Sequence, residues 1–127
     1  ISDVVLYTVS LADEVLIVAT PEPTSLTDAY ATIKVLATTQ GRRDIRLLVN
    51  QVSKPGEGRA IRMQLQQVVD RFVSPGLEVP VKLEFLGEVP LDPSVRDAVR
   101  RRQLLLECLP GCAAAQAVTA AATRLIA

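Results

Sequence analysis

The sequence predicts an α/β fold in which a parallel sheet of about three strands is flanked by helices. Two short runs, residues 14–20 and 44–50, indicate strands of the buried type found in parallel sheets, and a third strand is expected at residues 81–86 after Pro75, Gly76 and Pro80. Segments with apolar residues at helical spacing stand between and after these runs. Because strands that alternate with helices pair in parallel through right-handed crossovers, we expect helices on both faces of the sheet.

The first predicted strand, residues 14–20, leads into a helix whose start and end are both marked. Thr24 or Ser25 is expected to accept hydrogen bonds from the free N–H groups at the helix start, and Ser25 with Asp28 resembles a capping box. Gly41 is placed to end this helix. A shorter helix is expected in the residues that precede the strand.

The second predicted strand, residues 44–50, is followed by a helix with a clear apolar stripe. After the third strand, residues 81–86, Asp92 is expected to cap a helix and Pro93 to occupy its first turn. We expect this helix to continue to about Cys108, and a last, Ala-rich helix to complete the chain.

Composition places the whole chain, residues 1–127, in one domain of globular type, with 49% hydrophobic and 22% charged residues. The 14 basic and 14 acidic residues cancel, which argues against a nucleic-acid or acidic-membrane partner. The sequence holds no apolar run of the roughly 18 residues that a membrane helix needs, and no secretory signal. We therefore expect a soluble, cytoplasmic protein. Because the sequence begins at Ile1 rather than at Met, we expect it to be a fragment.

The residue types present argue against a metal site and against a catalytic nucleophile. Cys108 and Cys112 have C-x-x-x-C spacing, and there is no His in the chain. This is not the ligand pattern of zinc or redox sites, and a catalytic Cys or Ser would lack its usual imidazole base. We expect both cysteines to be small buried apolar residues, and we expect no metal site.

In open parallel sheets, ligands bind beyond the carboxyl ends of the strands. The loops that qualify here are residues 20–25, 50–53 and 87–92. Neither a G-x-x-x-x-G-K-[ST] nor a G-x-G-x-x-G motif occurs, so no backbone cradle for phosphates is predicted and no catalytic residue is assigned. Asn50 stands at a strand end, where its amide could recognise an adenine edge or could simply cap the adjoining loop.

Residues 12–30, ADEVLIVATPEPTSLTDAY, resemble the MinD/ParA superfamily of P-loop ATPases, and in particular the flagellar-number ATPases of the FlhG (FleN) type. Residues 48–52, LVNQV, and 86–95, LGEVPLDPSV, are similar to the base-binding segments of that family. The resemblance implies a partial P-loop NTPase fold, namely the C-terminal half without the phosphate-binding loop. The full-length parent would then bind ATP and Mg and dimerise in an ATP-dependent manner, whereas the fragment alone is expected to bind no cofactor and to be inactive.

The resemblance also implies roles for particular residues. It assigns the nucleotide base to Asn50, Val89, Pro90 and Leu91. It assigns a dimer or partner interface to Glu22, Thr24, Ser25 and Asp28. Flagellar or cell-pole proteins are possible partners, and membrane attachment is expected only through a segment outside the given sequence.

Two alternatives to the flagellar ATPase remain open. The chain could be a free-standing α/β interaction module, or a fragment of a ParA-type ATPase that partitions DNA. The second alternative would use the basic cluster Arg96, Arg100, Arg101 and Arg102. Because the net charge is zero and such a run usually forms a solvated helix face, we expect no nucleic-acid binding.

Overall fold

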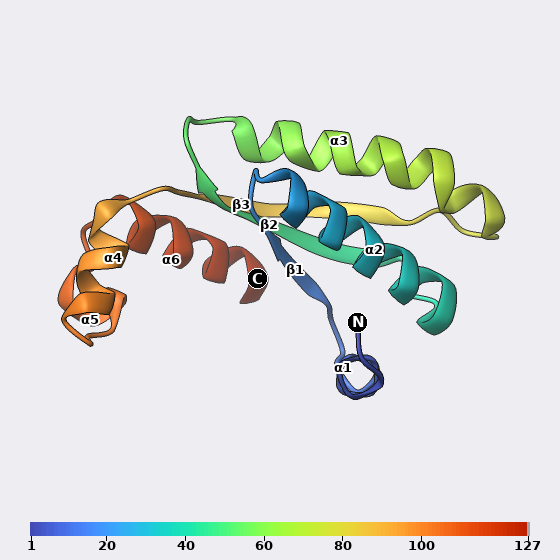
Figure 1. Cartoon of the computed structure of the whole chain (residues 1–127), viewed down its shortest axis with the longest axis horizontal. Coiled ribbons are helices and arrows are strands. Elements are labelled where there is room, and N and C mark those ends of the chain that lie inside the picture. The colour runs from blue at the N-terminus through green and yellow to red at the C-terminus, as the bar shows by residue number, and fades with distance from the viewer. Residues whose placement is uncertain (127) are drawn as a thin grey trace.

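Three parallel strands in the order β1-β2-β3 form the sheet around which the other elements are arranged (Figure 1). The computed structural model describes residues 1–126. In the register of the sheet, Leu16 lies opposite Arg46, and Asp44 lies opposite Lys82. The strands are β1 (Leu16–Ala19), β2 (Asp44–Val52) and β3 (Lys82–Pro90). The predicted α/β class with a three-stranded parallel sheet is therefore confirmed.

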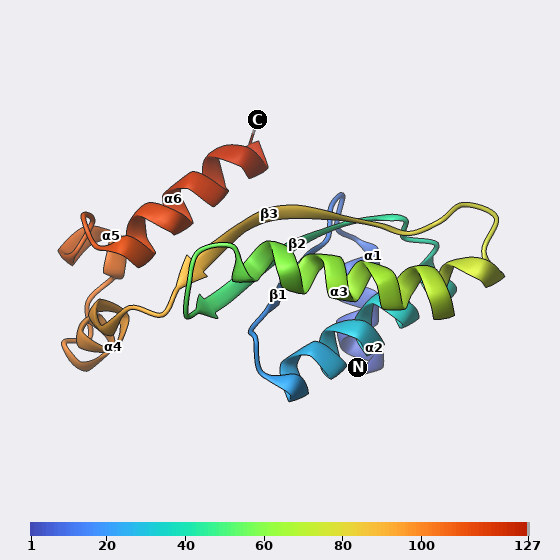
Figure 2. The same ribbon diagram turned by 90° about the horizontal axis from the view of Figure 1, so that it is seen from above.

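Helices cover both faces of the sheet (Figures 1 and 2). Two long helices pack together on one face, and a third lies against β3 on the opposite face. The long helices are α2 (Pro23–Gln40) and α3 (Glu57–Phe72), and the helix on the opposite face is α6 (Ala113–Ile126). The shorter elements are α1 (Asp3–Ser10), η1 (Ser74–Gly76), α4 (Pro93–Arg100) and α5 (Leu105–Cys108).

The hydrophobic core lies between the sheet and the pair α2 and α3. Side chains that alternate along β2 and β3 point toward these helices and are almost fully buried. The largest of the fully buried side chains are Ile33, Leu36, Ile45, Leu47, Val49, Val69, Val81 and Leu83. Burial of branched aliphatic side chains at this density supplies the main driving force for the fold.

Strand β1 departs from the prediction that it is buried on both faces. Leu16 is 39% exposed and Val18 is 56% exposed, whereas Ala19 is buried. Successive side chains of a strand point to opposite faces, so Leu16 and Val18 belong to the face on which α6 lies. Because α6 packs over β3, it leaves the apolar residues of β1 uncovered.

Small residues bring α6 close to the sheet. Ala114, Ala115 and Ala121 are buried, and a Cβ atom added at Gly87 of β3 would lie 3.7 Å from the Cβ of Ala121. Near the other end of the helix, Arg124 donates from Nη1 to the carbonyl oxygen of Leu86 at 2.6 Å. The small alanine side chains of α6 thus lie directly against β3 beside Gly87.

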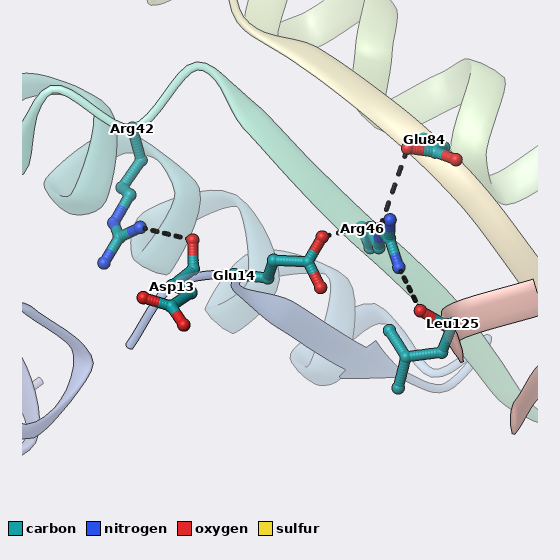
Figure 3. A network of polar contacts seen from close by, with 6 residues as sticks. All are labelled: Asp13, Glu14, Arg42, Arg46, Glu84 and Leu125. Atoms are coloured by element: carbon teal, nitrogen blue, oxygen red, sulfur yellow. Dashed lines mark hydrogen bonds and ion pairs between the residues drawn. The ribbon is translucent and has the colours of Figure 1, made fainter. Parts of the chain in front are cut away.

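Arg46, near the start of β2, anchors the end of α6 (Figure 3). Its Nη1 donates to the carbonyl oxygen of Leu125 at 3.2 Å, and its Nη2 lies 3.1 Å from Oε1 of Glu14. A weaker contact of 3.8 Å joins its Nε to Oε2 of Glu84. The helix end, the segment before β1 and the edge strand β3 are thus joined through one guanidinium group.

Helix α2 starts differently from the prediction. Pro23 occupies its first turn, Glu22 is the N-cap without a side-chain hydrogen bond, and Gly41 ends the helix at φ +68° as expected. The oxygen Oγ of Ser25 accepts a hydrogen bond from the backbone N–H of Thr20 at 2.9 Å. The predicted capping box is wrong, because proline moves the helix start upstream and frees Ser25 to fix the strand–helix loop.

The predicted helix from Pro93 to Cys108 is also wrong, since it is two helices. Helix α4 ends at Arg100, and Arg102, just beyond this end, adopts φ +55°. The N–H of Arg102 donates to the carbonyl of Val99 at 3.1 Å, and the N–H of Gln103 donates to that of Ala98 at 3.0 Å. This pair of bonds is a Schellman motif, which normally has glycine at the position of Arg102.

The cysteines are not buried as predicted. Cys108 and Cys112 are free and partly exposed. The Sγ atom of Cys112 accepts a hydrogen bond from the N–H of Ala115 at 3.4 Å, so it helps to cap α6. Among the described residues, no helix is both long and apolar enough to cross a membrane.

Candidate functional site

A groove of about 890 Å³ opens beyond the carboxyl ends of β2 and β3. One side is the last turn-like stretch of β2, with Asn50 and Gln51, and the floor is the segment 90–93 at the end of β3. Helix α4 provides the other side. Its contributing residues are Val95, Arg96, Asp97, Val99 and Arg100. The groove therefore lies where an open parallel sheet is expected to bind its ligands.

The β2 side of the groove has an unusual backbone. Gln51 adopts φ +59°, and its N–H donates to Oδ1 of Asn50 at 2.8 Å. The N–H of Leu91, just after β3, donates to the carbonyl of Val52, the last residue of β2, at 2.9 Å. A positive φ at a non-glycine residue is strained and is often retained at functional sites. These bonds hold the Asn50 amide at the groove, where its oxygen has a second lone pair and its NH₂ group is a donor.

Helix α4 presents an apolar strip and two cations to the groove. Val95 and Val99 are spaced by one turn, as are Arg96 and Arg100, and all four line the groove. Val99 is 70% exposed and Leu91 is 68% exposed. A flat apolar ligand with hydrogen-bonding edges would find both an apolar surface and polar partners here.

Asp92 lies in the groove and fixes the helices that surround it. Its Oδ1 accepts from the N–H of Ser94, and its Oδ2 accepts from the N–H of Ala114, each at 3.0 Å. Hydrogen bonds from the backbone of Ala114 and then of Ser94 hold the pKa of the Asp92 carboxyl below its usual value. The predicted N-cap role in α4 is confirmed. The bond to α6 gives no sequence signal, because the two residues are far apart in the chain.

The residues that the sequence resemblance assigns to the nucleotide base divide into two groups in the structure. Asn50, Pro90 and Leu91 line the groove. Val89 is 5% exposed, packs in the interior and does not line the groove. Sequence reasoning did not identify Gln51, and it treated the arginines of α4 as a solvated face. The i, i+4 spacing of Val95 and Val99 was a detectable signal for the apolar strip.

The residues assigned to an interface lie elsewhere, at the carboxyl end of β1. Glu22, Thr24 and Asp28 are exposed, and Ser25 is partly buried by its bond to the loop. They do not line the groove. Within residues 1–126, no group of three or more His, Cys, Asp or Glu side chains is placed to hold a metal ion.

Comparisons with known proteins find similar, longer proteins, although no family model matches the chain. The chain is 40% identical over 125 residues to the antiactivator FleN of Pseudomonas aeruginosa, with 98% of this chain and 42% of FleN covered. It is 30% identical over 115 residues to the flagellum site-determining protein YlxH of Helicobacter pylori, with 91% and 37% covered. The chain thus spans less than half the length of these curated relatives.

A solved structure agrees with these relatives. The MinD cell division protein of Aquifex aeolicus superposes with a TM-score of 0.67 and 28% sequence identity, over 93% of this chain and 45% of that protein. The shared architecture is that of a P-loop NTPase, and the match again extends over only part of the longer chain. Together the sequence and structural relatives support a MinD/ParA-type fragment, similar to part of the FleN-type flagellar regulators.

Proposed function

We propose that this chain is the nucleotide-base and partner-binding half of a regulatory ATPase that controls flagellar number or placement. The observation that carries the proposal is the groove at the carboxyl ends of β2 and β3, lined by an amide and an apolar surface. The names of the flagellar relatives support the biological role. Because those proteins are more than twice as long, the activity belongs to a full-length parent.

The groove suits a purine base. An amide that both donates and accepts is complementary to the adenine edge, which presents one donor beside one acceptor. Asn50 is held at the groove by Gln51, while Pro90 and Leu91 offer the apolar contact that a ring face needs. In the parent, ATP would place its adenine here, and Mg would be bound with the phosphates by residues outside this chain.

The loop after β1 is proposed as the contact to a second subunit or another protein partner. Glu22 and Thr24 are exposed, and Pro21 and Pro23 stiffen the loop, which limits the entropy lost on association. A nucleotide-dependent dimer built on this loop would act as a switch. Without the phosphate-binding half, the chain alone is proposed to lack ATPase activity.

The test is a base-preference measurement on the full-length parent. Asn50→Ala should weaken ATP binding by about 1–3 kcal/mol, the value of a bidentate amide–base pair, and should reduce the preference for ATP over GTP. Gln64→Ala, which removes an exposed amide from α3, is the matched control and should change neither quantity. If Asn50→Ala keeps the wild-type ratio of ATP affinity to GTP affinity, the proposal that the base binds in this groove is wrong.

A further inference from the structure

The Asp92 carboxylate joins two helices that are distant in the sequence. One oxygen caps the first turn of α4 through Ser94, and the other receives the N–H of Ala114 in the first turn of α6, 22 residues further along the chain. Both helix starts are therefore fixed to the point where β3 ends. A carboxylate in this position is stabilised by the positive ends of two helix dipoles.

The bond from Asp92 connects α6 to the groove. The same first turn has a second side-chain acceptor, Sγ of Cys112, which receives the N–H of Ala115 at 3.4 Å. Cys112 does not line the groove, whereas Asp92 does. A ligand that moves the segment 90–93 thus acts on α6 through the Asp92 carboxylate.

The other end of α6 is tied to the sheet. Arg124 donates to the carbonyl of Leu86, and Arg46 donates to that of Leu125 while it pairs with Glu14 before β1 (Figure 3). A continuous path of bonded groups therefore leads from the groove, through α6, to the start of the first strand. Such a path transmits a change only if its elements have two arrangements with different affinities for the ligand.

We infer that Asp92 is a positioning residue that couples a nucleotide base in the groove to the docking of α6 on β3. The inference rests on the proposed function, since it takes the base as the occupant of the groove. The base contacts the segment that contains Asp92, and the carboxylate carries the resulting constraint to the first turn of α6. By linkage, loosening of α6 must in turn weaken base binding.

The experiment uses the full-length parent with ATP as the probe. Amide hydrogen exchange in the first turn of α6, at Ala114, Ala115 and Gln116, is measured with and without ATP, and ATP affinity is measured by titration. In the wild type, ATP should slow exchange at these amides. Asp92→Asn keeps the shape of the side chain but has a single acceptor oxygen. It should abolish the ATP-induced protection and weaken ATP binding about tenfold.

Two further variants separate coupling from simple loss of a helix cap. Cys112→Ala removes the sulfur that accepts from the N–H of Ala115 and that also neighbours the Asp92 carboxylate, so it loosens the first turn of α6 and should weaken ATP binding about threefold. Ser2→Ala removes the oxygen that accepts from the N–H of Val5 and so uncaps α1, far from the groove. It should lower thermal stability and leave the ATP affinity unchanged.

The outcomes distinguish this inference from the proposed function. If the wild type binds ATP but ATP leaves exchange in α6 unaltered, the proposed function stands and the coupling is wrong. Coupling is also wrong if Asp92→Asn and Cys112→Ala lower the melting temperature but keep the wild-type affinity. If the wild type itself shows no adenine preference, the proposed function is wrong, and the coupling, which rests on it, is wrong as well.

Discussion

The carboxylate of Glu88 in β3 accepts a hydrogen bond from the backbone N–H of Gly58 in the first turn of α3, at 2.8 Å. Its second oxygen accepts from the N–H of Gly56 at 3.1 Å. A side chain from a strand thus closes the N-terminus of the neighbouring helix, where backbone N–H groups have no partner within the helix. The bonds draw α3 so close to β3 that position 58 has no room for a side chain.

Gly58→Ala should therefore destabilise the protein. An added Cβ would lie 2.7 Å from Oε1 and 2.8 Å from Cβ of Glu88, so both the cap and the strand must shift. We expect the free energy of unfolding to fall by about 1–3 kcal/mol, as for overpacked sites, although alanine favours helix. Gly76→Ala is the control, because a Cβ there meets nothing within 4 Å. Urea denaturation of the two variants gives the comparison, and equal stabilities would contradict the steric argument.

Arg46→Met should release the end of α6 while it retains most of the apolar stem. The variant loses the bond to Leu125 and the ion pair with Glu14. Because the Glu14 side chain is 59% exposed, that pair contributes little, and we expect a total loss of about 1 kcal/mol in unfolding free energy. Hydrogen exchange should rise at Leu125 and Ile126. Unaltered protection at these amides would show that Arg124 alone fixes the helix end.

Arg102→Gly should stabilise the protein by about 0.5–1 kcal/mol, because glycine adopts the observed φ of +55° without the steric penalty that arginine meets there. Arg101→Gly is the matched control. Arg101 has a helical φ of −78° and pairs with Asp97, so glycine at that position should destabilise. Thermal unfolding of both variants checks the prediction, which fails if the two substitutions change the melting temperature in the same direction.

Asp92 should make stability depend on pH in the acidic range. The folded-state pKa lies below the ordinary value of about 3.9. A carboxyl group whose pKa is lower in the folded than in the unfolded state stabilises the folded protein when it is ionised. This contribution is fully present above the unfolded-state pKa and is lost as the pH falls through the folded-state pKa. The stability difference between the wild type and Asp92→Asn should hold from neutral pH to about pH 5 and shrink below about pH 4. A difference that persists unchanged on acidification would mean that the carboxylate charge does not contribute.

Glu22→Lys in the full-length parent should weaken ATP-dependent dimerisation if the loop after β1 is an interface. Glu22 is exposed and its side chain makes no cap bond, so thermal stability should change by no more than about 0.5 kcal/mol. Sedimentation at matched concentrations, with and without ATP, measures the effect. Glu78→Lys, another exposed site, is the control. The same ATP-dependent dimer in Glu22→Lys and the wild type would leave the loop with a structural role only.

The sequence by itself determined the alternation of strands and helices, the parallel sheet and the helix boundaries marked by Asp92, Pro93 and Gly41. These features depend on local chemistry, namely apolar periodicity, side-chain caps and backbone preferences of glycine and proline. The start of α2 and the end of α4 were predicted wrongly because local signals compete with one another and have exceptions. Proline at position 23 outweighed the serine cap, and Arg102 adopts a conformation that sequence patterns assign to glycine.

Only the tertiary structure decided how distant residues meet. The placement of α6 over β3 leaves Leu16 and Val18 exposed, and no local pattern specifies which strand a helix will cover. The bond from Asp92 to Ala114 likewise depends on the chain returning to the end of β3. Such contacts depend on the relative placement of separate elements, which is set by the packing of the whole chain, and the sequence carries no local signal for them.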